Sequence, residues 1–311
     1  MAAAFASCQK ELCYDHTHGE VVGSLRVEFE WSNLEWADPS MMRLAMFRSG
    51  SKPVQVPFNG KDGGLVSLTH GSYDLIGYNS DTEVFGTRND SWSDFEIYTV
   101  ETELSAFSRM FATTRNIPRS RGTENELVVF EPEELWTSAR QDIQVVVQQT
   151  QSVKMPMQAA TTEYNFTINN VDNLKYVNEV AATLSGMSLS WLPAQGRPSN
   201  THSIIPFTMT KDSDGSIKGT VRTFGHCPGH DDDVESTHML TVYFELSDHS
   251  KYFFSFDVTE EMHDGRHWTE DETTEVPIVL DDIPLPTPIT NGSGLHPNVT
   301  EWMEVPVEID M

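Results

Sequence analysis

The stretch Gly64–Asp81, GLVSLTHGSYDLIGYNSD, contains two alternating runs that decide the expected fold class. In the first run Val66 and Leu68 alternate with polar residues, and after a His-Gly-Ser break the second run covers Tyr73–Asn79. Alternation with a period of two is typical of a β-strand with one face in a core. Two such runs around a short break predict a β-hairpin, with Gly71 taking a positive φ in its turn.

The same alternation recurs along the chain and predicts an all-β protein. The other expected strands cover residues 21–31, 42–48, 54–58, 95–102, 142–150, 152–157, 162–169, 204–210, 217–223, 239–246, 251–258, 276–280 and 302–311. The segments 204–223 and 239–258 each predict a further hairpin. In the first of these, the Asp-Ser-Asp-Gly sequence at 212–215 is similar to the start of a calcium-binding loop but lacks the acidic ligand at loop position 12, so we expect a plain turn.

The best helical candidate is Asn173–Leu184, NLKYVNEVAATL. Its apolar residues fall at helical spacing from Leu174 onward, and Gly186 stands where a helix would end. In an all-β chain the same segment could instead be a strand with a bend. We therefore expect at most one or two short helices.

Composition narrows the class of partner. The chain has 311 residues with 20 Lys and Arg against 47 Asp and Glu, which gives a formal net charge of −27. Such a charge repels phosphate groups, so nucleic-acid binding is not expected. The length suits two domains of ordinary size, and no run approaches the roughly 20 apolar residues of a transmembrane helix.

The most ligand-rich segment runs from His226 to His238, between two expected strands. It contains one Cys and three His that suit zinc, namely His226, Cys227, His230 and His238. Their spacing matches no standard zinc signature, and acidic loops often carry incidental His. We therefore expect an ordinary loop without a metal ion, and no cofactor elsewhere.

The start of the chain, Met-Ala-Ala-Ala-Phe-Ala-Ser-Cys, is similar to the end of a bacterial lipoprotein signal, in which cleavage precedes an acylated Cys. This pattern predicts lipidation at Cys8. At the other end, Val305, Val307 and Ile309 share one face of an expected strand. Pro306 cannot donate a ladder hydrogen bond, which favours an edge strand and makes these three residues the candidate partner strand.

Several segments, taken together and in order, resemble a known family. They are CQKELCYDHTH (8–18), VEFEW (27–31), MMRLAMF (41–47), LTHGSYDLIGYNSDTE (68–83), RGTENE (121–126), LTVYFEL (240–246) and EWMEVPVEIDM (301–311). They resemble a group of lipoproteins from gut Bacteroidales that is similar to the fimbrillin anchor and minor-subunit proteins of pili.

The resemblance implies two transthyretin-like β-sandwich domains in tandem. We expect them at residues 21–156 and 157–311, after a signal remnant and tether at 1–20. It also implies acylation of Cys8, an outer-membrane location facing the surface or periplasm, and contacts with other pilus or cell-surface proteins through strand addition. The sequence lacks the Arg cleavage site that polymerising subunits need before their first strand, which favours an anchor or accessory role.

The sequence suits three functions to different degrees. A non-enzymatic fimbrial or adhesion lipoprotein agrees best with the β pattern and the start of the chain. A surface carbohydrate-binding lipoprotein is the alternative, because Trp side chains can stack on sugars. The candidates are Trp31, Trp36, Trp92, Trp191, Trp268 and Trp302. An enzyme with a carboxylate pair ranks last because no local motif supports one.

Overall fold

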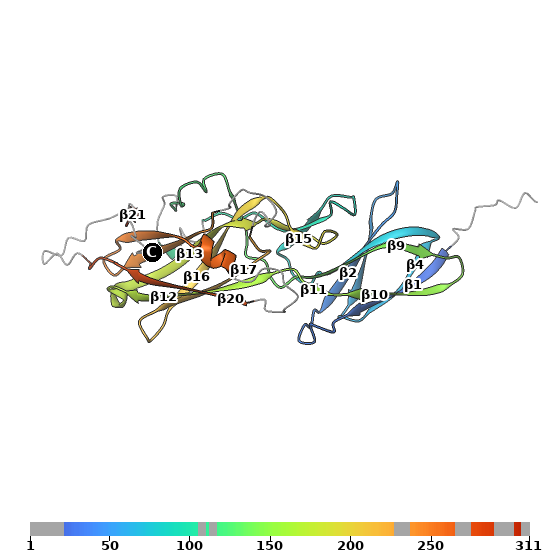
Figure 1. Cartoon of the computed structure of the whole chain (residues 1–311), viewed down its shortest axis with the longest axis horizontal. Coiled ribbons are helices and arrows are strands. Elements are labelled where there is room, and N and C mark those ends of the chain that lie inside the picture. Colours follow the sequence, from blue (N-terminus) through green and yellow to red (C-terminus); the bar gives the residue numbers. More distant parts are fainter. Residues whose placement is uncertain are drawn as a thin grey trace, which may run out of the picture.

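Alternating sequences form strands whose apolar faces meet in one core per lobe, and a further core lies between the lobes. The computed structural model describes residues 22–104, 110–111, 117–226, 237–264, 275–288 and 302–305. Figure 1 shows an elongated molecule with two lobes end to end, the first built from strands early in the sequence and the second from later strands. The expected all-β class with two sandwiches is confirmed.

The first lobe packs a sheet of three strands against a sheet of five (Figure 1). The smaller sheet has the order β10-β1-β4, with β1 (Val22–Glu30), β4 (Gly63–Thr69) and β10 (Thr150–Pro156). The larger sheet has the order β11-β9-β5-β2-β3, with β2 (Met41–Phe47), β3 (Val54–Asn59), β5 (Gly71–Asn79), β9 (Trp136–Val145) and β11 (Gln158–Ala159). Leu25, Val27 and Phe29 of β1 point into the core between the sheets while their neighbours face outward.

The predicted hairpin at Gly64–Asp81 is wrong, although both of its strands exist. β4 pairs with β1 of the small sheet, whereas β5 pairs with β2 and β9 of the large sheet. Only His70 separates β4 from β5, and one residue cannot form a hairpin loop. The chain therefore bends from one sheet to the other, and Gly71 lies at the bend with the expected positive φ of 148°.

The second lobe is one sheet of nine strands, curled so that its halves face each other. The order is β20-β12-β17-β16-β13-β18-β19-β21, with β8 on β16. The strands are β8 (Leu127–Val128), β12 (Thr162–Val171), β13 (Val177–Ser188), β16 (His202–Lys211), β17 (Ile217–Thr223), β18 (Met239–Leu246), β19 (Lys251–Asp257), β20 (Glu275–Ile283) and β21 (Trp302–Glu304). β16 joins the halves because its residues 202–208 pair with β13 and its residues 209–211 pair with β17.

The two other predicted hairpins are confirmed: β16 pairs with β17, and β18 pairs with β19, both antiparallel. The predicted helix at Asn173–Leu184 is wrong. Only Leu174–Tyr176 forms a 3₁₀ turn (η1), and β13 follows at the centre of the sheet. Both faces of β13 are buried, with Ala182 in the main core and Ala181 under Phe111 on the outer face. Because both faces of β13 are buried, its apolar residues are not confined to alternate positions, and their spacing resembles that of a helix.

A small sheet joins the lobes. Its order is β15-β14-β7-β6, with β6 (Phe85–Arg88), β7 (Glu96–Thr99), β14 (Ser190–Leu192) and β15 (Arg197–Pro198). It covers Ile76 and Tyr78 of β5 and shares a core with Phe224 at the end of β17. Strands from both halves of the sequence thus meet here, and β11 still belongs to the first lobe. The division of domains between residues 156 and 157 stays a proposal.

The described part of the chain has one short α-helix, α2 (Thr259–Asp264), directly after β19. No helix among these residues is long and apolar enough to cross a membrane.

Candidate functional site

Three histidines from three elements meet in the second lobe. His226 follows β17, His238 directly precedes β18, and His263 lies on α2. Their ring nitrogens all lie within 4.8 Å of one another. Among the residues that the structure describes, no other group of three or more His, Cys, Asp or Glu side chains converges in this way.

The rings are close enough to act as one cluster. His238 Nε2 and His263 Nε2 are 3.2 Å apart, a distance at which one imidazole N–H donates a hydrogen bond to the other ring. The ring centroid of His226 lies 5.5 Å from that of His238 and 5.0 Å from that of His263. The rings are inclined to one another rather than stacked, with an angle of 82° between His238 and His263. The nitrogens therefore converge at edges, as metal ligands do.

The cluster is sheltered on one side and open on the other. His226 and His238 are only 1% and 0% exposed, whereas His263 is half-buried. Burial, together with the charge of His263, lowers the pKa of His238 to about 4. Within the described part of the chain, the buried Nδ1 of His238 has no hydrogen-bond partner. His238 is therefore neutral near pH 7, the form in which imidazole binds metals.

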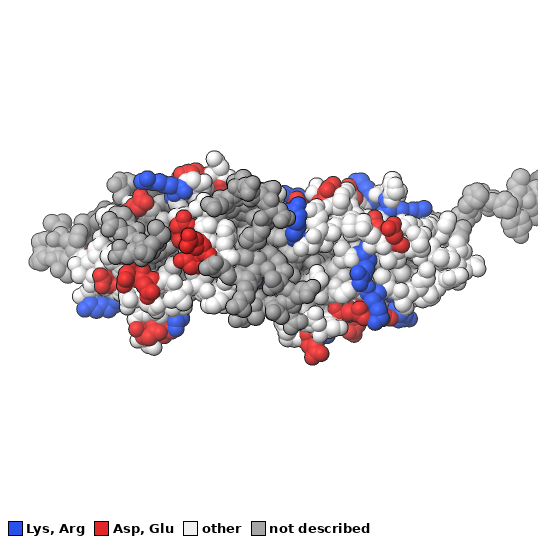
Figure 2. Space-filling model, viewed as in Figure 1, with Lys and Arg blue, Asp and Glu red and all other residues white. Residues whose placement is uncertain are grey.

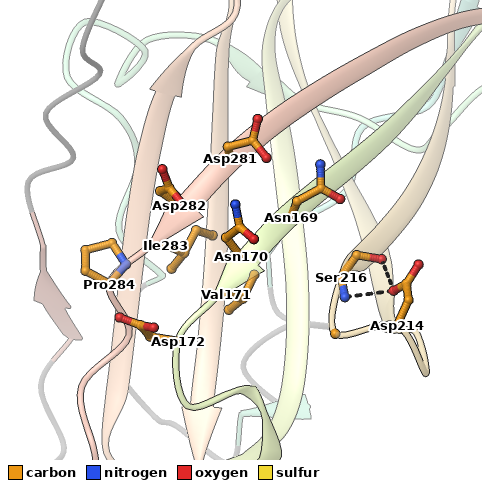
Figure 3. A pocket seen from close by; sticks show the side chains of 11 residues that line it. Asn169, Asn170, Val171, Asp172, Asp214, Ser216, Asp281, Asp282, Ile283 and Pro284 are labelled. Carbon is orange, nitrogen blue, oxygen red and sulfur yellow. Dashed lines mark hydrogen bonds between the residues drawn. The ribbon is translucent and has the colours of Figure 1, made fainter.

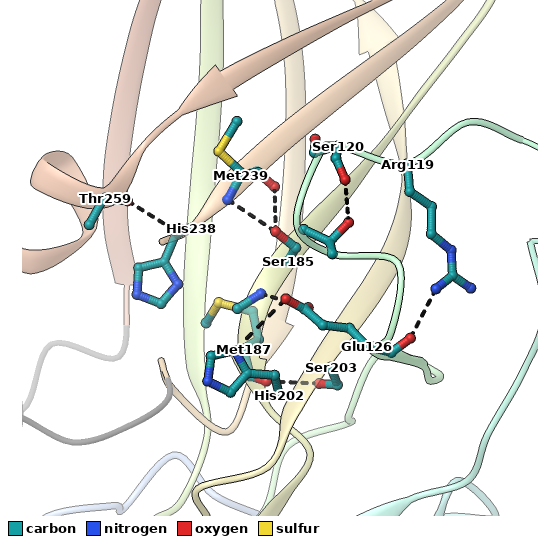
Figure 4. A network of polar contacts seen from close by, with 12 residues as sticks. Arg119, Ser120, Glu126, Ser185, Met187, His202, Ser203, His238, Met239 and Thr259 are labelled. Carbon is teal, nitrogen blue, oxygen red and sulfur yellow. Dashed lines mark hydrogen bonds and ion pairs between the residues drawn. The ribbon is translucent and has the colours of Figure 1, made fainter. Parts of the chain in front are cut away.

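The backbone around the cluster is fixed by hydrogen bonds (Figure 4). The N–H of His238 donates to Thr259 Oγ1, and Ser185 Oγ accepts from Met239 N. A bulge in β13 brings Gly186, with φ of 74°, so close that an added Cβ would lie 2.7 Å from His238 Nδ1. Only glycine fits beside the ring.

Beyond that bulge, Glu126 connects two neighbouring segments. Its Oε2 accepts a hydrogen bond from Gly186 N at 3.0 Å, and its Oε1 lies 3.8 Å from Nδ1 of the half-exposed His202. Figure 4 shows Glu126 and His202 together below the loop that carries Ser120. Glu126 thus ties the bulge of β13 to His202 at the start of β16.

A second, acidic depression lies elsewhere in this lobe, between β12, β20 and the turn of the β16–β17 hairpin. It is lined by Asn169, Asn170, Val171, Asp172, Asp214, Gly215, Ser216, Asp281, Asp282, Ile283 and Pro284. In Figure 3 the side chain of Asp214 lies on the turn, apart from Asp172, Asp281 and Asp282. Asp214 accepts hydrogen bonds from Ser216 Oγ at 2.6 Å and Ser216 N at 2.9 Å, which hold the pKa of its carboxyl below its usual value. The carboxylate thus stabilises a plain turn, as the sequence predicts.

Charged side chains do not form one large patch on the visible surface. Figure 2 shows Asp and Glu in several small groups, with Lys and Arg between them on both lobes.

The structure brings together two of the metal candidates that the sequence singled out, His226 and His238. Cys227 and His230 lie outside the described residues, as does Cys8. Sequence reasoning missed His263, which comes 25 residues after His238 in the helix TEEMHD. No spacing rule links the two positions, so only the fold reveals the third histidine.

The candidate partner strand is partly described. β21 pairs parallel with β19 over three residues, at the edge of the sheet. Val305 follows it, donates its N–H to Phe253 O at 3.2 Å and packs against the main core. Val307 and Ile309 lie outside the described residues. The expected edge position of this segment is observed at residues 302–305.

The tryptophans differ sharply in exposure. Trp191 is buried in the core between the lobes, and Trp302 packs edge-on against Phe111. Trp36 is 57% exposed and leans edge-on against Trp136, with ring centroids 5.8 Å apart. Trp36 is therefore the Trp best placed to stack on an external ligand, whereas Trp268 lies outside the described residues.

Comparisons with known proteins place the chain among others of the same fold. An adhesin candidate from Bacteroides ovatus ATCC 8483 is similar with a TM-score of 0.63 and 17% identity, covering 92% of this chain and 100% of that chain. The fimbrial anchor protein Mfa2 from Porphyromonas gingivalis is similar with a TM-score of 0.51 and 11% identity, covering 83% and 90%. No curated protein matches the sequence. At these identities the likeness to solved structures establishes the fold.

The family follows from the sequence itself. Residues 7–208 match the model of a family described as Domain of unknown function (DUF5119). This match covers more than half of the chain, including the whole first lobe and the sheet between the lobes. The chain therefore belongs to the DUF5119 family.

Proposed function

We propose that this protein is a non-enzymatic cell-surface protein, a fimbrial anchor or accessory subunit or an adhesion component. The observation that carries the proposal is the two-lobed β-sandwich fold, which resembles an adhesin candidate over that protein's full length and a fimbrial anchor over most of its length. The family resemblance of the sequence supports the same role.

The contacts with partner proteins would be made by strands. β21, at the start of the C-terminal segment, is the edge strand of the nine-stranded sheet and pairs with three residues of β19. In the proposed role this segment contacts the partner, with Val305, Val307 and Ile309 as the apolar residues of its expected strand. An edge strand of this kind recognises partners by strand addition.

Matched substitutions on opposite edges of the sheet test this proposal. Val305 lies beside β19, whereas Val279 is exposed on β20 at the other edge. In cells that express the protein natively, Val305→Asp is expected to abolish co-purification with other surface proteins after mild cross-linking, and Val279→Asp to leave it unchanged. Equal loss in both variants, or no loss in Val305→Asp, would contradict the role of this strand.

The proposal includes a lipid anchor at Cys8, which the sequence pattern supports. In the same cells the full-length protein is expected to carry an acyl mass and to sediment with membranes. Cys8→Ala is expected to release it. A Cys8→Ala variant that remains equally membrane-bound would remove the anchor from the proposal without affecting the adhesion role.

Carbohydrate binding is the second candidate, favoured by the exposed Trp36. A glycan array with the purified full chain would show saturable binding that Trp36→Ala abolishes and Tyr176→Ala, at another exposed aromatic residue, does not. Absence of saturable binding would dismiss this candidate.

A further inference from the structure

The three histidines are held in place before any ligand arrives. His226 forms a bridge with Met187 next to the bulge of β13. The carbonyl oxygen of His238 accepts a hydrogen bond from Val258 N. The carbonyl oxygen of Val258 in turn accepts one from Met262 N on α2, one position before His263. Three separate segments are thus tied by backbone hydrogen bonds at the points where they carry an imidazole. Such preorganisation reduces the entropic cost of binding an ion.

The separation of the nitrogens suits a tetrahedral metal ion. Two nitrogens bound to zinc at about 2.0–2.1 Å lie about 3.3 Å apart in tetrahedral geometry. His238 Nε2 and His263 Nε2 are 3.2 Å apart, and the third nitrogen is within 4.8 Å of both. A small rotation of the rings therefore brings all three nitrogens to bonding distance.

The chemistry of the donors selects the ion. Imidazole suits zinc, copper, nickel and cobalt, whereas calcium and magnesium prefer oxygen ligands. The charge of Asp257 acts on His238, and the net charge of −27 favours cations in general. We propose that His226, His238 and His263 form a binding site for a divalent transition-metal ion, Zn²⁺ by preference.

The three described ligands fill three positions of a tetrahedral ion, and a fourth donor completes it. Among the three histidines, the half-buried His263 is the one that reaches solvent. His226 and His238 form the buried side. The site is therefore reached through the side of α2.

The bound ion would stabilise the second lobe close to the core between the lobes. It would link α2 to the start of β18 and to the segment that follows β17. His226 is two residues from Phe224, which packs against Phe85 in the core between the lobes, with ring centroids 6.1 Å apart. An ion that binds the folded chain more tightly than the unfolded chain raises the melting temperature, and the rise continues with the logarithm of the free ion concentration after the site is filled.

The test uses the purified full-length chain, stripped of metal with a chelator. Titration with Zn²⁺ is expected to give one ion per chain by elemental analysis and a higher melting temperature. Co²⁺ is expected to give the strong visible absorption of a tetrahedral site. His263→Gln is expected to weaken Zn²⁺ binding by more than about 100-fold, since loss of even an outer partner of a ligand costs about 10–100-fold.

The control is His249→Gln. His249 is exposed and lies 2.7 Å from a carboxylate oxygen of Glu245, so it is another histidine beside an acid but outside the cluster. This variant is expected to bind Zn²⁺ as the original chain does. His263 is replaced first because it is half-buried, and circular dichroism of the metal-free variant verifies that it folds.

Three results would overturn the site: binding of less than one Zn²⁺ per chain, octahedral Co²⁺ absorption, or full retention of Zn²⁺ in His263→Gln. The last result would place the ion elsewhere in the chain. The adhesion role stands or falls separately, because its tests involve Val305 and Cys8.

Discussion

The segments β4–β5 and β18–β19 have the same local signature and different pairing. Each consists of two strands rich in apolar residues around a polar break. β18 and β19 form an antiparallel hairpin from Met239 opposite Asp257 to Glu245 opposite Lys251. β4 and β5 instead lie in opposite sheets of the first lobe and form a corner of the sandwich.

The length of the connection explains the difference. Residues 247–250 separate β18 from β19, and Asp248 Oδ1 accepts from Ser250 N at 3.0 Å within that turn. A single residue separates β4 from β5, too few to reverse the chain. Before the corner the core residues have even numbers, Val66 and Leu68, and after it they have odd numbers, Tyr73 and Leu75. This shift lets the side chains of both strands face the same core. Alternation defines strands, and the connection decides which strands pair.

The largest expected effect concerns the hairpin, whose strands carry core contacts of their own. Phe254 on β19 is fully buried and meets Phe244 of β18 edge-on, with ring centroids 5.6 Å apart. Phe254→Ala leaves a cavity and is expected to lower the free energy of unfolding by about 3–5 kcal/mol in urea titrations. The exposed Val279→Ala should change it by less than about 0.5 kcal/mol. A cost of Phe254→Ala as small as that of the control would contradict the packing of the hairpin.

The next effect depends on pH. Burial raises the pKa of Tyr243 on β18 from 10.0 to about 12. Between these values the folded chain holds the phenolic proton and the unfolded chain releases it, so stability is lost as pH rises. The free energy of unfolding is expected to fall by about 2–3 kcal/mol from this group between pH 10 and 12.

The control for that measurement is Tyr243→Phe, which removes the group and also the hydrogen bond from its hydroxyl to Pro118 O. Urea titrations at both pH values should show a shallower alkaline loss in this variant than in the original chain. Equal slopes would mean that Tyr243 ionises as readily in the folded chain as in the unfolded one.

A smaller effect is expected at the corner itself. Gly71 has φ of 148°, a conformation that residues with a Cβ rarely adopt. An added Cβ would lie 3.4 Å from the guanidinium of Arg48, an ordinary contact, so the cost arises in the backbone. Gly71→Ala is expected to destabilise the protein by about 1–3 kcal/mol in thermal or urea unfolding. The exposed neighbour Ser72→Ala serves as control, and equal stability of the two variants would show that the corner tolerates any residue.

The smallest expected effect concerns a hydrogen bond that connects β5 to β4 across the corner. The hydroxyl of Tyr73 on β5 donates to Thr69 O at the end of β4, at 2.9 Å. Tyr73→Phe keeps the ring in the core and removes this bond, with an expected cost of about 0.5–1.5 kcal/mol by chemical denaturation. Tyr176→Phe, at an exposed ring, should be neutral. If Tyr73→Phe leaves the free energy of unfolding unchanged, the hydrogen bond to Thr69 O does not stabilise the corner.

The candidate site was predictable only in part. The density of His, Cys and Asp in the segment 226–238 drew attention to His226 and His238. His263 gave no signal, because a metal site is defined by convergence in space, and α2 lies beside the cluster only through the pairing of β18 with β19, which returns the chain to His238. The exposed Trp36 was one of six candidate tryptophans, and the structure separated it from the buried ones by its surroundings.

By itself, the sequence determined the all-β class, the position of most strands and the turns of two hairpins, because side-chain alternation and turn residues act over a few neighbouring positions. It also indicated the positive φ of Gly71. Only the tertiary structure decided that β4 and β5 lie in opposite sheets, that β13 is a central strand rather than a helix, and that His263 joins His226 and His238. These outcomes depend on what packs against both faces of a strand and on which segments meet across the fold, and local residue patterns do not contain that information.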